Sequence, residues 1–369
     1  MKYYLISGEA SGDLHGSQLI RALKAIDPDA HFRAWGGDLI KQEGVILVKH
    51  YKELSIMGFW ELIPNIPKIL KNIKYCKEDI LKYMPDAIIY IDYPGFNLRI
   101  SKWAQIQGFK NHYYISPKVW AWKENRVRQM KRSLDALYVI LPFEKDFYEK
   151  NHQFPVKFVG HPLLDQLSYY QKNTAFFESY NLNPKKPVIA LLPGSRIQEI
   201  QKILPVFIKV ADHFKMYQFV IAGAPGVTFE KYIPFIKKSN LKVIKDHTYD
   251  LLQNSTAALV ASGTATLETA LFEIPQIVCY ISNSLNYWIG KKLIKLKYIS
   301  LVNLILNKEA LTELIQDDCN VKNLIYHLKE LLKKDELEKI NKDYQDLKLK
   351  LGGPGASKKT AKLIFDSLK

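Results

Sequence analysis

Cysteine is scarce in this sequence, and long apolar runs are missing. The only cysteines, Cys76, Cys279 and Cys319, lie far apart without CxxC or Cys/His ligand spacing, so we expect free thiols and no metal site. No run approaches the roughly 18 uninterrupted apolar residues of a membrane-spanning helix. The first segment, MKYYLISGEASGD, has too short an apolar part for a signal peptide, so we expect a cytoplasmic protein.

Acidic residues are also in deficit. The chain has 53 Lys and Arg against 37 Asp and Glu, a net charge of +16, which calls for an anionic partner or a Lys-rich solvated surface. The lysines are scattered, and no zinc finger, aromatic RNA-binding motif or other nucleic-acid signature accompanies them. We therefore expect no nucleic-acid partner. Charge alone does not decide between an anionic lipid surface and simple solvation.

Short apolar runs alternate with helical segments along most of the 369 residues. This pattern predicts α/β structure with two Rossmann-like parallel-sheet domains facing an interdomain cleft, the GT-B architecture. We expect the domains at 1–168 and 185–348, joined by a polar linker around 166–187. A charged amphipathic helix is expected over 322–350, a basic helix around 284–297, and a helix within 349–369 that crosses back to the first domain. The predicted strands are 3–7, 31–37, 86–92, 112–116, 135–140, 156–160, 187–192, 219–223, 242–245, 258–261 and 275–281.

Ligands of open α/β sheets bind beyond the carboxyl ends of the strands, so the turns there are the first candidates for a site. The turn GEASGDLHG (8–16) has glycines that permit close backbone approach, whereas Glu9 and Asp13 disfavour a pyrophosphate. An equally good interpretation is a tight strand–helix turn capped by Ser11 and Asp13.

Two turns in the second half suit a nucleoside diphosphate. Gly194, Ser195 and Arg196 end one strand and open a helix, which predicts free backbone N–H groups beside a bidentate cation. The second turn, SGTATLE (262–268), places Glu268 one helical turn after small and hydroxyl residues, within reach of a ribose. A surface arginine and an acid favoured by the helix dipole are the alternatives. Without a Walker lysine, ATP and magnesium are not expected.

Asp92 is the candidate general base. It ends the apolar strand DAIIYID and precedes Pro94, so its carboxylate should project beyond the sheet edge. An inverting sugar transfer needs one group to remove the proton of the acceptor hydroxyl, and a carboxylate in this place can do so. An Asx turn or a helix cap would use the same residue type.

These segments together resemble the lipid-A-disaccharide synthase family, glycosyltransferase family 19. The resemblance covers nearly the whole chain and rests on ISGEASGDLHG, WGGDLIKQEG, IMGFWEL, IDYPGFN, YYISPKVWAWKENRV, LPFEKDFY, FVGHPL, LLPGSRIQEI, SGTATLE and LGGPGAS. It implies inverting transfer of diacylglucosamine from UDP-2,3-diacylglucosamine to 2,3-diacylglucosamine 1-phosphate. The products are a β-1,6-linked disaccharide phosphate and UDP. No metal or organic cofactor is implied.

The resemblance also implies roles for single residues. Asp92 corresponds to the family's essential aspartate. Departures from the family pattern are Gly95 in place of an aspartate, Gln276 in place of an apolar residue and Val302 in place of a proline. The UDP and donor residues are Gly194, Ser195, Arg196, Ser262, Gly263, Thr264, Ala265, Thr266, Glu268 and Asn303. The acceptor and cleft-loop residues are Glu9, Ser11, Gly12, Asn97, Ser116 and Trp120.

A lipid acceptor requires contact with a membrane surface, and segment 57–77 has suitable chemistry. It combines apolar residues with lysines, as in helices that lie in the interface of an anionic membrane, here the cytoplasmic face of the inner membrane. A packed helix with a solvated lysine face is the alternative. The predicted membrane patch comprises Phe59, Trp60, Leu62, Ile63, Ile66, Lys68, Ile69, Leu70, Lys71 and Lys74.

One functional alternative shares the phosphate turns. It is another GT-B UDP-N-acetylglucosamine transferase or epimerase with soluble substrates, which does not account for SPKVWAW or for the apolar-basic segment. The oligomeric state stays open, with a homodimer among the options.

Overall fold

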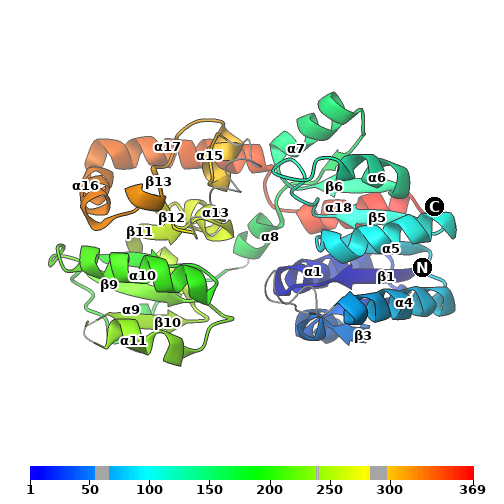
Figure 1. Cartoon of the computed structure of the whole chain (residues 1–369), viewed down its shortest axis with the longest axis horizontal. Coiled ribbons are helices and arrows are strands. Elements are labelled where there is room, and N and C mark those ends of the chain that lie inside the picture. Colours follow the sequence, from blue (N-terminus) through cyan, green and yellow to red (C-terminus); the bar gives the residue numbers. More distant parts are fainter. Residues whose placement is uncertain (55–65, 169, 238, 240, 283–296) are drawn as a thin grey trace. The chain divides into compact units, whose positions relative to one another are not determined.

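The computed structural model describes residues 1–54, 66–168, 170–237, 239, 241–282 and 297–369 (Figure 1). The chain forms two compact units. The first unit comprises Met1–Ser168 together with Leu351–Lys369, and the second unit comprises Tyr169–Lys350. Each unit has its own parallel sheet, so the chain has the two-domain α/β architecture that the strand pattern predicts.

The first unit contains a seven-stranded sheet in the order β3-β2-β1-β4-β5-β6-β7, and all neighbouring strands run parallel. Buried parallel strands are apolar throughout because helices cover both of their faces. In β4, every residue from Ala87 to Ile91 is buried. The other strands are β1 (Lys2–Ser7), β2 (His31–Gly36), β3 (Ile46–His50), β5 (Lys110–Tyr114), β6 (Ala136–Val139) and β7 (Lys157–Phe158).

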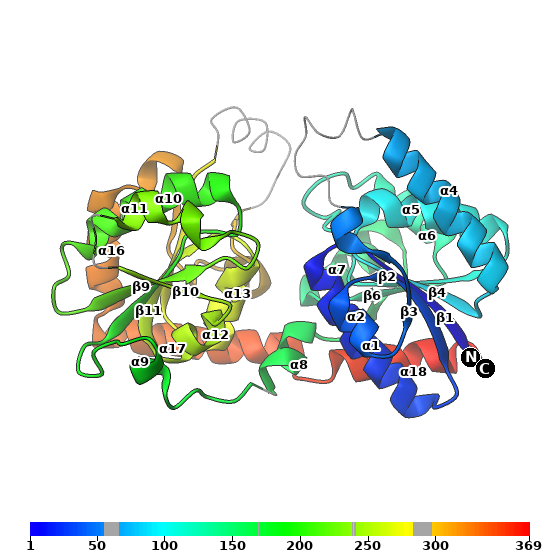
Figure 2. The same cartoon turned by 90° about the horizontal axis from the view of Figure 1, so that it is seen from below.

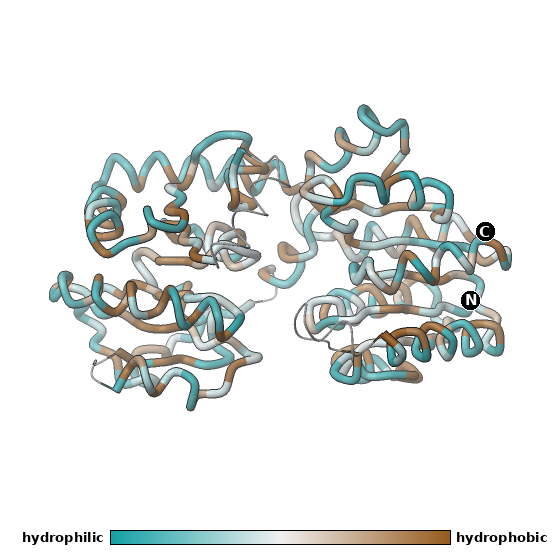
Figure 3. The backbone as a smooth tube through the Cα atoms, in the orientation of Figure 1, coloured by the Kyte–Doolittle hydropathy of each residue, from teal (hydrophilic) through white to brown (hydrophobic). Residues whose placement is uncertain are grey.

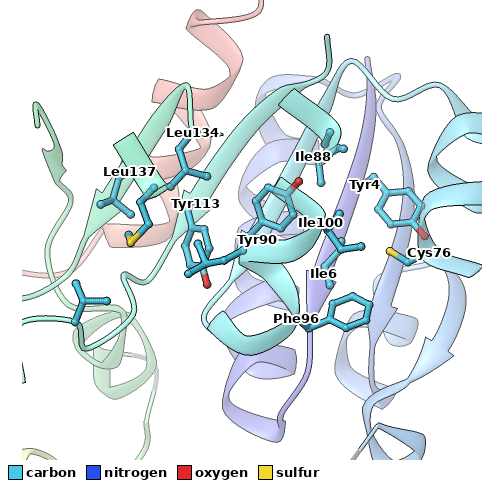
Figure 4. Close-up of a cluster of buried hydrophobic side chains, with 14 of the residues drawn as sticks. Tyr4, Ile6, Cys76, Ile88, Tyr90, Phe96, Ile100, Tyr113, Leu134 and Leu137 are labelled. Atoms are coloured by element: carbon cyan, nitrogen blue, oxygen red, sulfur yellow. The ribbon is translucent and has the colours of Figure 1, made fainter. Parts of the chain in front are cut away.

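Helices cover both faces of the first sheet, so a hydrophobic core lies on each face. Successive residues of a strand point alternately into one core and the other. Figure 2 shows α4, α5 and α6 on one side and α1, α2 and α18 on the other. Tyr4 and Ile6 belong to the core under α4 and α5, which Figure 4 shows in detail, whereas Tyr3 and Leu5 pack toward α1 and α18. The helices are α1 (Ala10–Ile26), α2 (Asp38–Gln42), α4 (Ile66–Tyr83), α5 (Pro94–Ile106), α6 (Arg126–Ser133), α7 (Pro142–Asp146), α8 (Pro162–Ser168) and α18 (Ala356–Asp366).

Helix α18 completes the first unit although it follows the whole second unit in the sequence. It packs against α1, and its Ala361 and Ile364 are fully buried in the core on that face. Asp165 caps its start by accepting hydrogen bonds from the backbone N–H groups of Gly355, Ala356 (3.1 Å) and Ser357 (2.9 Å).

The second unit contains a six-stranded parallel sheet in the order β10-β9-β8-β11-β12-β13. Figure 3 shows apolar residues, in brown, along its strands and on its helices. The strands are β8 (Val188–Leu192), β9 (Gln218–Gly223), β10 (Lys242–Lys245), β11 (Ser255–Ala261), β12 (Gln276–Tyr280) and β13 (Glu313–Ile315). The helices are α9 (Phe176–Ser179), α10 (Ile197–Ala211), α11 (Ile233–Ile236), α12 (Thr248–Gln253), α13 (Thr264–Leu271), α15 (Leu301–Leu306), α16 (Val321–Leu331) and α17 (Lys334–Leu351).

The structure differs from the predicted elements in four places. Strands β3 and β13 were not predicted, and the single helix expected over 322–350 is divided into α16 and α17. Part of the expected linker 166–187 is packed, because Phe176 is fully buried in the second unit's core. Most of the basic helix expected around 284–297 lies outside the described residues. No helix within the described part of the chain is long and apolar enough to cross a membrane.

Candidate active site

Each sheet has one point at which the chain changes its direction of winding, and the candidate residues gather there. In the first sheet this point lies between β1 and β4, and in the second between β8 and β11. Loops at such a switch point diverge and leave a crevice at the carboxyl ends of the strands. Asp92 follows β4, and the turns at Gly194 and Ser262 follow β8 and β11. Topology alone therefore selects the turns that the sequence predicted.

Asp92 occupies an unusual backbone conformation at its switch point. Asp92 and Tyr93 both have left-handed φ angles, 44° and 50°. Few non-glycine residues adopt this conformation, and aspartate adopts it more readily than most. The buried Asn97 side chain stabilises it by donating to the carbonyl of Asp92 at 2.7 Å, and the Tyr113 hydroxyl donates to the same carbonyl. Asn97 thus positions Asp92 through the backbone, while its Oδ1 has no hydrogen-bond partner among the described residues.

The environment of Asp92 suits a general base. Burial is the main cause that raises the pKa of its carboxyl to about 6, and the negative charge of Glu9 raises it further. The positive charge of Lys118 acts in the opposite direction. A carboxylate with this pKa is ionised above pH 6 and is a stronger proton acceptor than an ordinary aspartate. Lys118 was not predicted as a site residue, although it lies in the SPKVWAW segment.

The GEASGD turn is closely packed, and one of its carboxylates, that of Asp13, bonds to the start of another helix. Glu9 is exposed and precedes the first residue of α1, and Ser11 is exposed in the first turn. At Gly12 a Cβ would lie 2.9 Å from the Cβ of Ser7, so only glycine fits there. The expectation that Asp13 caps its own turn is wrong. Its carboxylate accepts from the N–H groups of 37, 39 and 40 and so caps α2.

The predicted cleft-loop residues Ser116 and Trp120 both hydrogen-bond to side chains of the first unit. Ser116 is buried, with its hydroxyl 2.5 Å from that of Tyr148. The Trp120 indole donates to Glu144 at 3.1 Å. Burial is the main cause that raises the pKa of Glu144 to about 7, although it also accepts two backbone N–H bonds at the start of α7. The sequence signal that could have indicated Glu144 is in LPFEKDFY, where a glutamate two residues after a proline is typical of a helix start.

Sequence patterns also did not indicate His15, which is partly buried, or His161, which is buried. Burial lowers the pKa of His15 to about 4 and that of His161 to about 3, so both are neutral near pH 7. His161 accepts from the N–H of Leu163 through Nδ1, which leaves its proton on Nε2. His15 follows β1 and His161 follows β7, so both lie toward the edge that carries Asp92.

In the second unit, a pocket of about 350 Å³ adjoins the start of α10 and the ends of β11 and β12. Arg196 and Ser262 both line it, so the two predicted phosphate turns meet at one hollow. Gly194 has a φ of 118°, and the Arg196 side chain is 81% exposed. The prediction of free backbone N–H groups at this turn is wrong. Those of Ser195 and Arg196 donate to the Glu199 carboxylate at 3.0 and 3.3 Å.

The second turn leads into α13 as the sequence predicts. Gly263 has a φ of 157° and precedes the helix, and Thr264 is exposed, whereas Thr266 is buried and bonds to the carbonyl of Gly263. Ala265 is partly buried against the second unit's core. Glu268 accepts from the Tyr249 hydroxyl at 3.2 Å, and burial raises the pKa of its carboxyl.

Asn303 and Gln276 have structural contacts. The Asn303 amide donates to Leu311 and Glu313 and accepts from the N–H groups of Ala310 and Leu311. Since these four bonds match its two donors and two lone pairs, any role in donor binding is a positioning role. Gln276 begins β12, at the amino end of the strand and away from the pocket, and donates to the carbonyl of Thr266.

The predicted membrane patch is described only in part. Phe59, Trp60, Leu62 and Ile63 lie outside the described residues. Helix α4 begins at Ile66 and exposes Ile66 (46%) and Leu70 (59%). The lysines Lys68, Lys71 and Lys74 are also exposed, whereas Ile69 packs partly on the core.

Within the described ranges, no group of His, Cys, Asp and Glu side chains could hold a metal ion. The three cysteines are free and buried, as expected.

Solved structures with the same fold define the class of protein. The S. aureus MnaA–UDP co-structure aligns with a TM-score of 0.68 at 14% identity, over 100% of this chain and 97% of that one. A UDP-GlcNAc 2-epimerase from Neisseria meningitidis bound to UDP-GlcNAc aligns at 0.65 and 13%, over 100% and 99%. Together with the two parallel sheets, these alignments define a protein of the GT-B fold.

Sequence relatives define the family within that class. The family model described as lipid-A-disaccharide synthetase matches residues 3–365. A lipid-A-disaccharide synthase from Geobacter metallireducens is 35% identical over 99% of this chain and 96% of its own length. One from Nitrosococcus oceani is 36% identical over 99% and 95%. The chain belongs to the lipid-A-disaccharide synthetase family, which makes it a glycosyltransferase.

Proposed function

We propose that this chain transfers diacylglucosamine from a UDP-linked donor to the 6-hydroxyl of diacylglucosamine 1-phosphate. The products are a β-1,6-linked disaccharide phosphate and UDP. Membership of the lipid-A-disaccharide synthetase family supports the reaction. The observation that carries the assignment of roles is Asp92, a partly buried carboxylate at the first unit's switch point with its pKa raised to about 6.

Asp92 acts as the general base of the transfer. It takes the proton of the acceptor 6-hydroxyl while that oxygen bonds to the anomeric carbon of the donor. The bond from the anomeric carbon to the diphosphate breaks, and UDP leaves with the electron pair. Attack opposite the leaving group inverts the anomeric centre. The left-handed backbone at Asp92, held by Asn97, fixes the direction in which the carboxylate points.

The second unit binds the UDP part of the donor in the pocket between α10 and the end of β11. The exposed Arg196 guanidinium offers two parallel N–H donors to the diphosphate and stabilises the charge that develops on departing UDP. The small turn Ser262–Gly263–Thr264 lets phosphate oxygens approach the start of α13. Glu268, on the next turn of that helix, is the partner for the ribose hydroxyls.

The lipid substrates require a membrane surface, and α4 supplies the matching chemistry. Its exposed Ile66 and Leu70 enter the headgroup boundary, while Lys68, Lys71 and Lys74 meet anionic headgroups on the cytoplasmic face of the inner membrane.

The deciding experiment mixes the purified chain with UDP-diacylglucosamine and diacylglucosamine 1-phosphate and identifies the product by mass. We expect the disaccharide 1-phosphate and an equimolar amount of UDP. UDP release that does not need the diacylated acceptor would contradict the proposal, and a UDP-N-acetylglucosamine reaction with soluble partners would replace it.

A further inference from the structure

A carboxylate of the chain itself occupies the diphosphate turn of the second unit. Glu199 Oε2 lies 3.0 Å from the backbone nitrogen of Ser195 and 3.3 Å from that of Arg196, and accepts both N–H bonds. Its Oε1 lies 4.0 Å from the Arg196 guanidinium. The side chain folds back so closely over Gly194 that a Cβ there would lie 2.5 Å from Oε2. The guanidinium that the proposed function assigns to the diphosphate already faces Glu199, and so do the two backbone N–H groups beside it.

This carboxylate also lines the hollow in which the proposed function places the diphosphate. Glu199 and Arg196 line the same hollow, and Ser262 of the second phosphate turn lines it too. A carboxylate and a phosphate accept hydrogen bonds from the same kinds of donor and carry charge of the same sign. Because each backbone N–H group makes one strong hydrogen bond, Ser195 and Arg196 cannot serve both anions at once.

We propose that Glu199 is an internal anion that competes with the diphosphate of the donor for the Ser195–Arg196 turn. The inference rests on the proposed function, since it takes the turn to be part of the donor site. Donor binding moves the carboxylate off the two N–H groups, and its return helps to expel UDP after transfer. The carboxylate keeps the helix start satisfied between turnovers and lowers affinity for the product.

The test removes the charge of residue 199 and keeps the size and shape of its side chain. Glu199→Gln retains an oxygen that can accept from the turn but removes the negative charge. Calorimetric titration with UDP, UMP and uridine then compares ligands that share a base and differ in phosphate. We expect UDP to bind about three- to tenfold more tightly to the variant, the range for one net hydrogen bond. The gain should be smaller for UMP and absent for uridine, which has no phosphate.

A second capping glutamate provides the matched control. Glu53 in the first unit accepts from the N–H of His50 at the start of a short 3-10 turn, and Glu53→Gln should leave UDP binding unchanged. If Glu199→Gln does not fold, Glu199→Ala offers a second route to the same titration. Equal or weaker binding of UDP by a folded variant would overturn the inference and make Glu199 a structural cap only. Failure of the unaltered chain to bind UDP would overturn the proposed donor site and the inference with it.

Discussion

The two sheets are built alike, yet their carboxyl edges carry different chemistry. In the first unit, carboxylates dominate: burial raises the pKa of Asp92 to about 6 and that of Glu144 to about 7. In the second unit, glycine and hydroxyl residues leave room beside the exposed Arg196, and a pocket opens there. On the same topology, the proposed function therefore assigns proton removal to one unit and anion binding to the other. What differs is the residues that follow the strands at each switch point.

Among tests of this difference between the two units, Asp92→Asn should have the largest effect. We expect kcat to fall by roughly 10²- to 10⁴-fold, the usual contribution of a general base, while UDP binding stays unchanged because the second unit supplies it. Turnover with the synthetic substrates and calorimetry with UDP measure the two effects. Asp86→Asn is the control, since Asp86 lies at the opposite end of the same strand and accepts from the N–H of Lys2. Near-normal turnover in folded Asp92→Asn would remove the base assignment.

Membrane binding should depend on the first unit's α4. Replacing Lys68, Lys71 and Lys74 with glutamine should weaken binding to anionic vesicles roughly 100-fold, at about 1 kcal/mol for each lysine near the surface. Cosedimentation with vesicles that contain anionic lipid measures this. A matched triple change in the second unit, at the exposed Lys334, Lys339 and Lys342, should have little effect. Equal losses in both variants would mean that net charge alone drives binding.

Arg196→Ala examines the second unit. Because the side chain is 81% exposed, we expect the low end of the range for a charged hydrogen bond, roughly a tenfold loss of UDP affinity. Arg196→Lys should recover part of it, since the charge remains but the two parallel donors do not. Calorimetry with UDP gives both values. If Arg196→Ala lowered kcat without weakening UDP binding, arginine would act on the transition state alone.

The smallest effects are shifts in pH dependence. A base must be deprotonated, so activity should fall as the pH drops through about 6, the pKa of Asp92. Glu9→Gln removes a charge that raises this pKa, so the acid limb of the kcat/KM profile should move to lower pH. Lys118→Met removes a charge that lowers it, so the limb should move to higher pH. Shifts of the same sign would show that at least one of the two residues does not act through its charge on Asp92.

Sequence patterns predicted the sheets better than the contacts of individual side chains. Buried parallel strands are apolar throughout, so the sequences of β4 and β8 clearly predicted strands. The short edge strands β3 and β13 carry polar residues and gave no such signal. The predicted fold class directed attention to the carboxyl ends of the strands, which is why Asp92 and the two phosphate turns became candidates.

The wrong predictions at the site concern the hydrogen-bond partners of polar side chains. Asp13 looked like a cap for its own helix and instead caps α2, which is 24 residues or more away along the chain. Glu199 occupies a turn that was expected to be open, although a glutamate three residues after the N-cap residue, here Arg196, is a capping-box signal. Asn303 seemed free to contact a donor, but partners at 310–313 use its whole amide. The contacts of Asp13 and Asn303 depend on tertiary packing, which spacing in the sequence does not encode, whereas the contact of Glu199 is local.

The docking of α18 on the first unit has a consequence for synthesis on the ribosome. Residues 1–168 leave the ribosome long before α18, and until then the surface that receives Ala361 and Ile364 stays uncovered. Domains generally fold as units while they are being made, so the second unit can fold within this interval. The first unit reaches its final state only when Asp165 receives its three N–H partners. The half of the enzyme that starts first therefore finishes last, and the nascent chain exposes an apolar face that chaperones can recognise.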